Sequence, residues 1–302
     1  MIPIAQHPDV AALVRMALHE DLRFGGDVTC AATLAPGAQL SGLVRAKEAG
    51  VVCGLWLFAE VFAQLSQLGG ATVDVSEVTA DGTAVQPGDI VIRMRGDATA
   101  MLIGERTALN FCQRLSGTAT LTRRYVEAVA GTRAQILDTR KTTPGMRLLQ
   151  KHAVLAGGGA NHRIGLFDQV LIKDNHIALM PPGPLGSGPA EAVRRSRERL
   201  GEAVIVEVEI ERLEDLEPCI RAGADIILLD NLPPAAVREA VVRRDACVSP
   251  RYVQLEASGG ITLQTVRSFA EAGVDRISTG ELTHSVRSLD LSMRCDPYGS
   301  VG

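Results

Sequence analysis

Aromatic residues are rare in this chain of 302 residues, and neither sign of charge is in large excess. Phe, Trp and Tyr make up 3% of it, which is too few for the stacking platforms that bind single-stranded nucleic acid. The formal net charge is -4, whereas proteins that bind nucleic acid or membrane surfaces carry a basic face. We therefore expect no nucleic-acid partner and no membrane partner.

Cysteine motifs and long apolar runs are absent too. The six cysteines form no CxxC pair and follow no regular spacing, so the sequence indicates neither a zinc site nor a disulfide framework. No apolar run approaches the ~18 residues of a membrane-spanning helix. The opening stretch MIPIAQHPDV lacks the basic and apolar regions of a signal peptide. Together these absences favour a cytoplasmic protein.

Lysine is scarce as well, since four of the 31 basic residues are lysines and 27 are arginines. Three of the four, Lys141, Lys151 and Lys173, fall within one short part of the chain. Lysine is a compact point charge that planar arginine does not replace. The clustering hints at an anion site near the stretch ILDTRKTTPGMR (136–147).

Apolar residues make up 46% of the chain, which is enough for a large hydrophobic core. From about residue 135 onward they are grouped in a regular pattern. Short apolar runs alternate there with helical patterns; the runs are QILD (135–138), QVLI (169–172), VIVEVEI (204–210), DIILLD (225–230), YVQLEAS (252–258) and DRIST (275–279). This alternation predicts a parallel sheet covered on both faces, either open or closed. Because no GxGxxG opens a strand–helix unit and each run ends in a polar residue, the pattern favours a barrel with its working groups at the C-terminal end.

The first 115 residues have a different pattern. DVAALVRMALHEDL (9–22) is an amphipathic helix, and SGLVRAKEAGVVCGL, GATVDVSEV and DIVIRMRGDA alternate as antiparallel strands do. We predict an α+β domain over residues 1–115, an α/β barrel over 116–281, and a C-terminal segment, 282–302, that packs back on the first domain. The loop PPGPLGSGP (181–189) is either a cover for the barrel mouth or a disordered surface loop.

Charged or small residues follow every strand of the predicted barrel. They are Asp138, Thr139, Arg140 and Lys141; Lys173, Asp174, Asn175 and His176; Asp230 and Asn231; Ser258, Gly259 and Gly260; and Ser278, Thr279 and Gly280. A single charge at a strand end is usually just solvated, but the ends of parallel strands share one rim. Within the third strand, Glu207 and Glu209 share a face, and inward acids are costly unless cations or a metal accompany them.

The rim combines two kinds of charge, the cations Arg140, Lys141, Arg163 and Lys173 and the acids Glu209 and Asp230. The cations suit carboxylates or phosphates, and the acids suit a Mg²⁺ that bridges phosphate oxygens. The small residues after the last two strands suit a phosphate. The residues alone thus predict an enzyme for a phosphorylated polyanion. A Schiff-base aldolase that uses Lys141 or Lys173, and a lysine-assisted decarboxylase, fit the same inventory.

Seven motifs resemble those of the quinolinate phosphoribosyltransferase family, in order and from about residue 20 to 292. They are EDLRFGGDVT, GERTALNFCQRLSGTAT, LDTRKTTPGMR, GGGANHRIGLFDQVLIKDNH, VEVEIERLEDLEPCIRAGADIILLDN, EASGGIT and ISTGELTHSVRSLDLS. The resemblance implies transfer of a phosphoribosyl group from 5-phosphoribosyl 1-pyrophosphate to quinolinate with decarboxylation, a step of NAD biosynthesis. It also implies an N-terminal α/β sandwich, an incomplete seven-stranded α/β barrel, and a homodimer or assembly of dimers.

The resemblance assigns roles by position. Quinolinate would contact Arg106, Arg140, Lys141, His162, Arg163 and Lys173, with Arg106 supplied by the neighbouring subunit to a shared active site. Phosphoribosyl pyrophosphate would contact Lys141, Lys173, Glu209, Asp230, Ser258, Gly259, Gly260 and Gly280. The catalytic residues would be Lys141, Glu209 and Asp230, and the last two would hold Mg²⁺.

Two related functions compete with this interpretation. A paralogue associated with molybdate transport departs from the family at IKDNH and ERTALN, and both stretches are intact here. Nicotinate phosphoribosyltransferase binds a substrate with one carboxylate, whereas the number of cations here suits two. Both features favour quinolinate.

Overall fold

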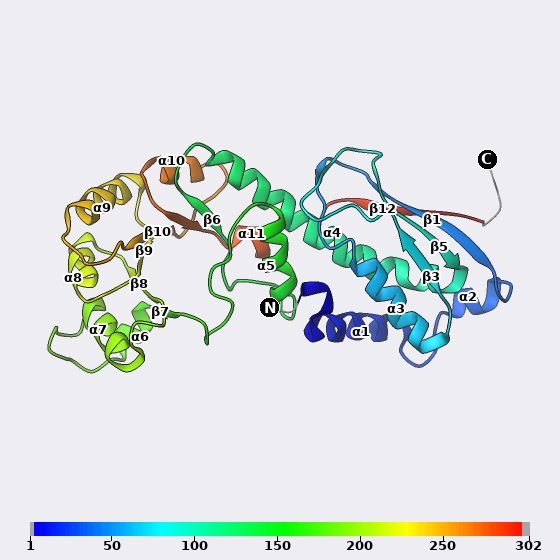
Figure 1. Ribbon diagram of the computed structural model, residues 1–302, viewed down its shortest axis with the longest axis horizontal. Coiled ribbons are helices and arrows are strands. Elements are labelled where there is room, and N and C mark those ends of the chain that lie inside the picture. The colour runs from blue at the N-terminus through cyan, green and yellow to red at the C-terminus, as the bar shows by residue number, and fades with distance from the viewer. Residues whose placement is uncertain (1–2, 298–302) are drawn as a thin grey trace. The chain divides into compact units, whose positions relative to one another are not determined.

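The computed structural model describes residues 3–297, which form two compact units (Figure 1). The first, here called the antiparallel unit, comprises Met1–Arg123, Thr143–Gly158 and Ser285–Gly302. The second, the parallel unit, comprises Arg124–Thr142 and Gly159–His284. Along the described residues, no helix combines the length and the apolar character that crossing a bilayer requires.

The antiparallel unit is built on a four-stranded sheet with strand order β12-β1-β5-β3. Its strands are β1 (Gln39–Ala46), β2 (Gly50–Val51), β3 (Val73–Ser76), β4 (Ala84–Val85), β5 (Ile90–Asp97) and β12 (Leu291–Pro297), of which β2 and β4 pair separately. Its helical segments are η1 (Ile4–Gln6), α1 (Pro8–Leu22), α2 (Val28–Thr33), α3 (Leu57–Gly69), α5 (Arg147–Ala156) and the greater part of α4 (Ala98–Ala128). Strand β12 thus adds the end of the described chain to the edge of β1.

Alternating apolar side chains create the core of this unit. In β1 the buried positions recur every second residue up to Val44 and Ala46, as expected of a sheet with one covered face. Helix α3 buries Leu57, Phe58 and Val61 in the same cluster, and its apolar positions repeat at helical spacing.

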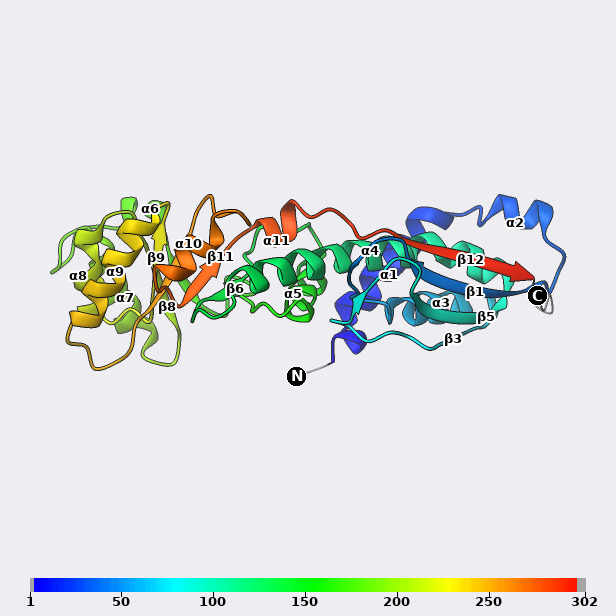
Figure 2. The ribbon, with the colours of Figure 1, turned by 90° about the horizontal axis from the view of Figure 1, so that it is seen from above.

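The parallel unit contains six parallel strands in the order β6-β11-β10-β9-β8-β7. The strands are β6 (Gln135–Leu137), β7 (Val170–Ile172), β8 (Val206–Ile210), β9 (Ile226–Asp230), β10 (Gln254–Ser258) and β11 (Arg276–Ser278). The helices are α6 (Asp174–Ala178), α7 (Pro189–Leu200), η2 (Leu213–Asp215), α8 (Leu216–Arg221), α9 (Pro234–Ala246), α10 (Val266–Glu271) and α11 (Glu281–His284). Helices α7, α8 and α9 lie outside the strands in both ribbon views (Figures 1 and 2). The predicted parallel sheet with helical covers is confirmed.

One further extended residue lies beside β6. Ala160 forms an isolated parallel bridge with Leu137, so the six-strand order continues by a single residue and not by a full strand.

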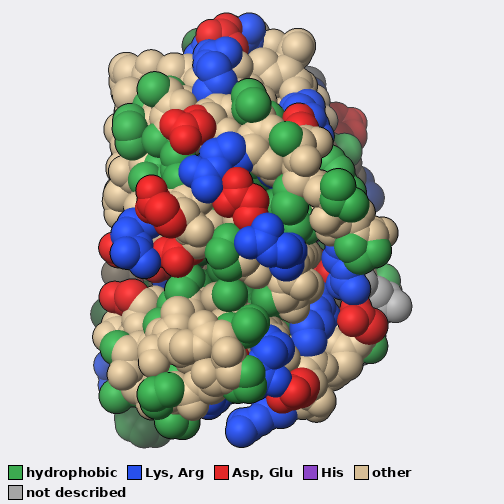
Figure 3. All heavy atoms as spheres, turned by 90° about the vertical axis from the view of Figure 1, so that its left-hand side faces the viewer, with side chains coloured by type: hydrophobic (Ala, Val, Ile, Leu, Met, Phe, Trp, Pro, Cys, Tyr) green, Lys and Arg blue, Asp and Glu red, His purple; other side chains and the backbone are tan. Residues whose placement is uncertain are grey.

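The outer helices carry charges of both signs side by side, as Figure 3 shows for the face with α8 and α9. Arg243 and Glu217 are one such pair, at 2.7 Å.

Both predicted domain boundaries fall inside helices, since the boundary at 281/282 lies within α11 (Glu281–His284). Residue 115 lies in the middle of α4, a single helix of 31 residues, because the predicted helical stretch runs on without a break. The segment Thr143–Gly158, which contains α5, belongs by its contacts to the antiparallel unit. The predicted domain limits therefore stay a prediction, and the last five residues of the segment 282–302 lie outside the described residues.

The loop at residues 181–189 is held against α7. Arg195 donates hydrogen bonds to the carbonyl oxygens of Pro181 and Pro182, at 2.7 and 3.0 Å. The buried Glu191 accepts the backbone N–H of Leu185 at 3.2 Å and pairs with Arg195 at 2.7 Å. The loop is thus tied to α7 at its first two prolines and at Leu185.

Candidate active site

A cavity of about 640 Å³ opens at the carboxyl ends of the parallel strands. Ten of the twelve predicted site residues line it: Arg140, Lys141, His162, Arg163, Lys173, Glu209, Asp230, Ser258, Gly259 and Gly260. Thr139, Leu171, Leu228, Asn231 and Ser278 complete the lining. The strand ends bring these residues together because every strand of the sheet points its carboxyl end the same way.

The other two predicted residues, Gly280 and Arg106, do not line the cavity. Gly280 is next to it, since a Cβ at this position would lie 3.1 Å from Cδ of Lys141, so glycine leaves room for the lysine side chain. Arg106 is exposed on α4, in the antiparallel unit. A helix-surface arginine carries no signal of its own, and only the resemblance singled it out.

Two arginines crowd one side of the cavity. The Nε atoms of Arg140 and Arg163 are buried and have no hydrogen-bond partner among residues 3–297. Burial lowers the pKa of Arg163, and the charge of Arg140 lowers it further. Two guanidinium groups that repel each other and retain unused donors form a site for a carboxylate or phosphate anion.

Lys141 is fixed at the end of β6 through its backbone. Its N–H donates to Oγ1 of Thr139 at 3.0 Å, and its carbonyl oxygen accepts the hydroxyl of Thr283 at 2.8 Å. These bonds satisfy the chain where it leaves the sheet, so the ammonium group projects from an ordered base.

Two carboxylates lie at the ends of the neighbouring strands β8 and β9. Glu209 pairs with Nζ of Lys173 at 3.0 Å, and Asp230 accepts a hydrogen bond from Nδ2 of Asn231 at 2.8 Å. Mg²⁺ is usually held by one or two carboxylates together with substrate phosphates. The donor set of this rim therefore fits a magnesium ion.

The turn after β10 presents glycines in left-handed conformations. Gly259 has φ +96° and Gly260 has φ +60°, and a Cβ on Gly259 would lie 2.3 Å from Oδ1 of Asn231. Asn231 itself has φ +55° and donates its backbone N–H to the carbonyl oxygen of Ser258 at 3.0 Å. Consecutive residues of this kind expose backbone N–H groups to an anion.

A buried charge network surrounds His162, which lines the cavity. Its Nε2 lies 3.1 Å from Oε2 of Glu207 and 3.4 Å from Oε1 of Glu256, and both glutamates are fully buried. Arg276 pairs with Glu256 at 2.6 Å, and Nε2 of Gln169 donates to Glu207 at 2.5 Å. Every charged member thus has a partner, as buried charge requires.

The network determines the charge of His162. Burial alone would lower the pKa of this histidine, but its interactions with Glu207 and Glu256 outweigh burial and raise the pKa to about 9. Burial raises the pKa of Glu256, yet His162 and Arg276 outweigh it, so the pKa is lowered. Burial and the charge of Glu256 raise the pKa of Glu207. The two carboxylates therefore favour a proton on Nε2 of His162, while its Nδ1 accepts the backbone N–H of Arg163 at 2.7 Å.

The sequence revealed only part of this network. The period-two spacing of Glu207 and Glu209 indicated inward acids in need of cations, and His162 was predicted from the resemblance. The pairing of Glu256 with Arg276 was missed, because two residues on adjacent strands meet only once the register of β10 and β11 is known.

Comparison with family models covers nearly the whole chain. The model described as "Quinolinate phosphoribosyl transferase, N-terminal domain" matches residues 27–116, and the corresponding C-terminal domain model matches residues 118–294.

Curated relatives and solved structures are similar along most of their length. A probable nicotinate-nucleotide pyrophosphorylase (carboxylating) of Bacillus subtilis is 44% identical over 250 residues, which cover 83% of this chain and 81% of that one. The Mycobacterium leprae nicotinate-nucleotide pyrophosphorylase (carboxylating) is 41% identical, covering 93% and 95%. The structure of the Francisella tularensis nicotinate-nucleotide pyrophosphorylase superposes with a TM-score of 0.87 at 36% identity, covering 98% of this chain and all of that one.

Proposed function

Since the chain belongs to the quinolinate phosphoribosyltransferase family, we propose that its cavity joins quinolinate to 5-phosphoribosyl 1-pyrophosphate. The products are nicotinate mononucleotide, pyrophosphate and CO2, as the first step from quinolinate into NAD biosynthesis. The membership predicted from the seven motifs is confirmed. The residue roles below rest on the chemistry of the cavity.

The observation that carries the choice of substrate is the pair Arg140 and Arg163. Quinolinate has two carboxylates on adjacent ring atoms, and two crowded guanidinium groups with unused donors match them in charge and in fork geometry. His162 and the lysines Lys141 and Lys173 line the same cavity and add hydrogen-bond donors and positive charge to it.

The phosphoribosyl pyrophosphate would occupy the opposite part of the cavity. The left-handed turn of Ser258, Gly259 and Gly260 offers backbone N–H groups to its 5′-phosphate, and Gly280 supports this region from the next strand end. Lys141 and Lys173 are point charges suited to the pyrophosphate.

Glu209 and Asp230 are proposed to hold Mg²⁺. When bound, the ion neutralises charge on the departing pyrophosphate. Glu209 also positions Lys173 through their ion pair. Both carboxylates can stabilise the positive charge that develops on the ribose as its C1–O bond breaks.

The bond changes follow from how the chain holds the two substrates. The C1–O bond to pyrophosphate breaks with its electron pair on the leaving oxygen, and the pyridine nitrogen attacks C1. The resulting pyridinium withdraws electrons, so the 2-carboxylate leaves as CO2, and the electron pair that remains on C2 takes up a proton. Alignment of the two substrates by Arg140, Arg163 and Lys141 supplies the proximity that this sequence needs.

We further propose that the parallel unit is the incomplete seven-stranded barrel of the family and that the antiparallel unit is its N-terminal sandwich. The bridge between Leu137 and Ala160 supports a seventh, very short strand. A homodimer, or an assembly of dimers, with Arg106 entering the neighbour's cavity is also proposed. Leu166, Phe167 and Leu179, which are 72%, 84% and 88% exposed in the single chain, support burial against a partner. A cytoplasmic location completes the proposal.

Purified protein with Mg²⁺ and phosphoribosyl pyrophosphate should form nicotinate mononucleotide from quinolinate. Nicotinate, which lacks the 2-carboxylate, should give no comparable turnover in the same assay, followed by chromatography of the nucleotide. Turnover with nicotinate and none with quinolinate would refute the proposed reaction.

A further inference from the structure

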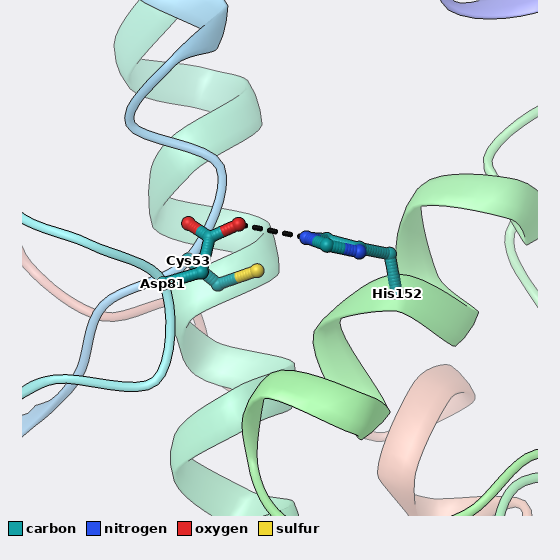
Figure 4. Close-up of side chains that lie close together, drawn as sticks. All are labelled: Cys53, Asp81 and His152. Carbon is teal, nitrogen blue, oxygen red and sulfur yellow. Dashed lines mark hydrogen bonds and ion pairs between the residues drawn. The ribbon is translucent and has the colours of Figure 1, made fainter. Parts of the chain in front are cut away.

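Three side chains with metal-binding atoms meet in the antiparallel unit, and none of them lines the cavity: Cys53, Asp81 and His152 (Figure 4). The thiol sulfur, a carboxylate oxygen and an imidazole nitrogen lie within 4.8 Å of one another. They belong to the loop after β2, the loop before β4, and α5. We propose that the three side chains bind a divalent transition-metal ion of the zinc class, which fastens α5 to the two loops.

The donor atoms need little movement to surround an ion. Nε2 of His152 lies 2.7 Å from Oδ2 of Asp81, which is a hydrogen-bond distance. Tetrahedral zinc, with bonds of about 2.0–2.3 Å, spaces its ligands about 3.3–3.7 Å apart. The side chains of His152 and Asp81 are 25% and 20% exposed, whereas Cys53 is fully buried. An ion would therefore enter from the side of His152 and Asp81, after a small rotation of the imidazole.

The groups around the cluster already orient its ligands. The backbone N–H of Gly54 donates to Oδ1 of Asp81 at 2.7 Å, and Nε1 of Trp56 donates to Oδ2 at 3.2 Å. The ring of Trp56 also meets the ring of His152 edge-on, with centroids 6.4 Å apart. Outer hydrogen bonds and packing of this kind hold metal ligands in position.

The backbone fixes Cys53 opposite Asp81 independently of any ion. Val52 donates its N–H to the carbonyl oxygen of Thr83 at 3.0 Å, and Gly82 donates to the carbonyl oxygen of Val52 at 2.9 Å. The two loops are thus tied together on either side of the cluster. The ion would therefore add no new connection between these two loops. It would add one between the loops and α5, through His152.

The donor types select the ion. Thiolate and imidazole ligands favour zinc and its transition-metal neighbours, whereas Mg²⁺ prefers oxygen alone. On binding, the Cys53 thiol releases its proton to water and the sulfur coordinates as thiolate. Three protein ligands and an exposed edge leave the fourth position for water. The wide separation of the three residues in sequence explains why no cysteine motif indicated this site.

Cobalt is the probe for the test, because a thiolate bound to Co²⁺ gives a charge-transfer absorption that oxygen and nitrogen ligands do not. Protein dialysed against chelator and returned to excess Mg²⁺ should show this band with one equivalent of Co²⁺, and Zn²⁺ should abolish it. Cys53→Ala should lose the band, and His152→Ala should bind at least ~10-fold more weakly. Cys247→Ala, which removes a partly exposed cysteine outside the cluster, should keep the band.

Thermal unfolding gives a second, independent readout. Zn²⁺ should raise the Tm of the wild type by more than that of His152→Ala, which binds it more weakly; this variant alters a partly exposed side chain and should fold. The proposal is overturned by the absence of a thiolate band, by a band that persists in Cys53→Ala, or by equal stabilisation of the wild type and His152→Ala. No outcome depends on enzymatic activity, so the proposed function is tested separately.

Discussion

Arg140 and Arg163 repel each other across a part of the cavity where both retain a buried, unused donor. The folded protein carries this repulsion, and an anion that binds between the two side chains relieves it. The arrangement favours a substrate with two adjacent carboxylates over a substrate with one, since each arginine then has its own oxygen acceptors.

We therefore expect Arg140→Lys to raise the KM for quinolinate at least ~10-fold, because the ammonium keeps the charge but loses the planar fork. The KM for phosphoribosyl pyrophosphate should change little. Arg238→Lys, on the exposed surface of α9, is the matched control and should behave as the wild type. Equal increases in both KM values would contradict a specific carboxylate contact. Steady-state kinetics with each substrate varied in turn make the comparison.

Glu256→Gln should shift the pH dependence of quinolinate binding. The pKa of His162 is raised to about 9 by Glu207 and Glu256, so kcat/KM for quinolinate in the wild type should fall as pH rises through about 9. Without the Glu256 charge the pKa of His162 drops, and the fall should occur at lower pH. The profile of kcat/KM against pH measures this shift.

The same raised pKa has a consequence for stability. The interactions of His162 stabilise the fold fully below about pH 6.5, and this stabilisation is lost as pH rises through about 9.

The control for the kinetic experiment with Glu256→Gln is Glu217→Gln, which removes the partly exposed partner of Arg243. It should leave the pH profile of kcat/KM unchanged. A profile that is identical in Glu256→Gln and the wild type would show that His162 does not depend on this carboxylate.

At the scale of elements, α5 approaches the loop before β4 very closely. A Cβ on Gly82 would lie 2.9 Å from the carbonyl oxygen of Ala156, at the end of α5, and Gly82 has φ +84°. Glycine is thus required both for its conformation and for the contact.

Gly82→Ala should lower the free energy of unfolding by about 1–3 kcal/mol more than Gly88→Ala does. Gly88 has a similar φ of +96°, but a Cβ there would meet nothing within 4 Å, so it isolates the cost of the backbone conformation. Denaturant unfolding of both variants gives the difference. Equal losses would mean that α5 does not pack against this loop.

The strands of the parallel unit were predictable from the sequence, because buried parallel strands are continuous apolar runs. QILD and DRIST enclose β6 and β11, and the run at 204–210 encloses β8. The polar residues after these runs line the cavity, since the carboxyl ends of parallel strands share one rim. The assignment of α5 to the antiparallel unit was not predictable, because it depends on contacts between residues far apart in the sequence, such as His152 and Asp81, which are 71 positions apart.

At the scale of the whole molecule, the cavity of a single chain lacks one of the predicted quinolinate contacts, Arg106. Arg106 is exposed on α4 and is not part of the cavity lining drawn from residues 3–297. If a second copy supplies it, each site combines residues of two chains, and two different inactive variants can complement each other.

Mixing Arg106→Ala with Lys141→Ala, after subunit exchange, should restore up to roughly a quarter of wild-type activity, since half of the dimers are mixed and each has one intact site. Each variant alone should be nearly inactive, and Lys47→Ala, which alters an exposed lysine outside the cavity lining, should be fully active. Inactive mixtures, despite demonstrated exchange, would argue against a shared site. A product assay on the mixture reports the outcome.

Release of the 2-carboxylate tests the central claim most directly. With quinolinate labelled in that carboxylate, the wild type should release one labelled CO2 for each nicotinate mononucleotide formed, and only when phosphoribosyl pyrophosphate is present. Lys141→Ala should lose both products together, by roughly 100-fold or more. Nucleotide that retains the label, or no product from quinolinate at all, would contradict the account.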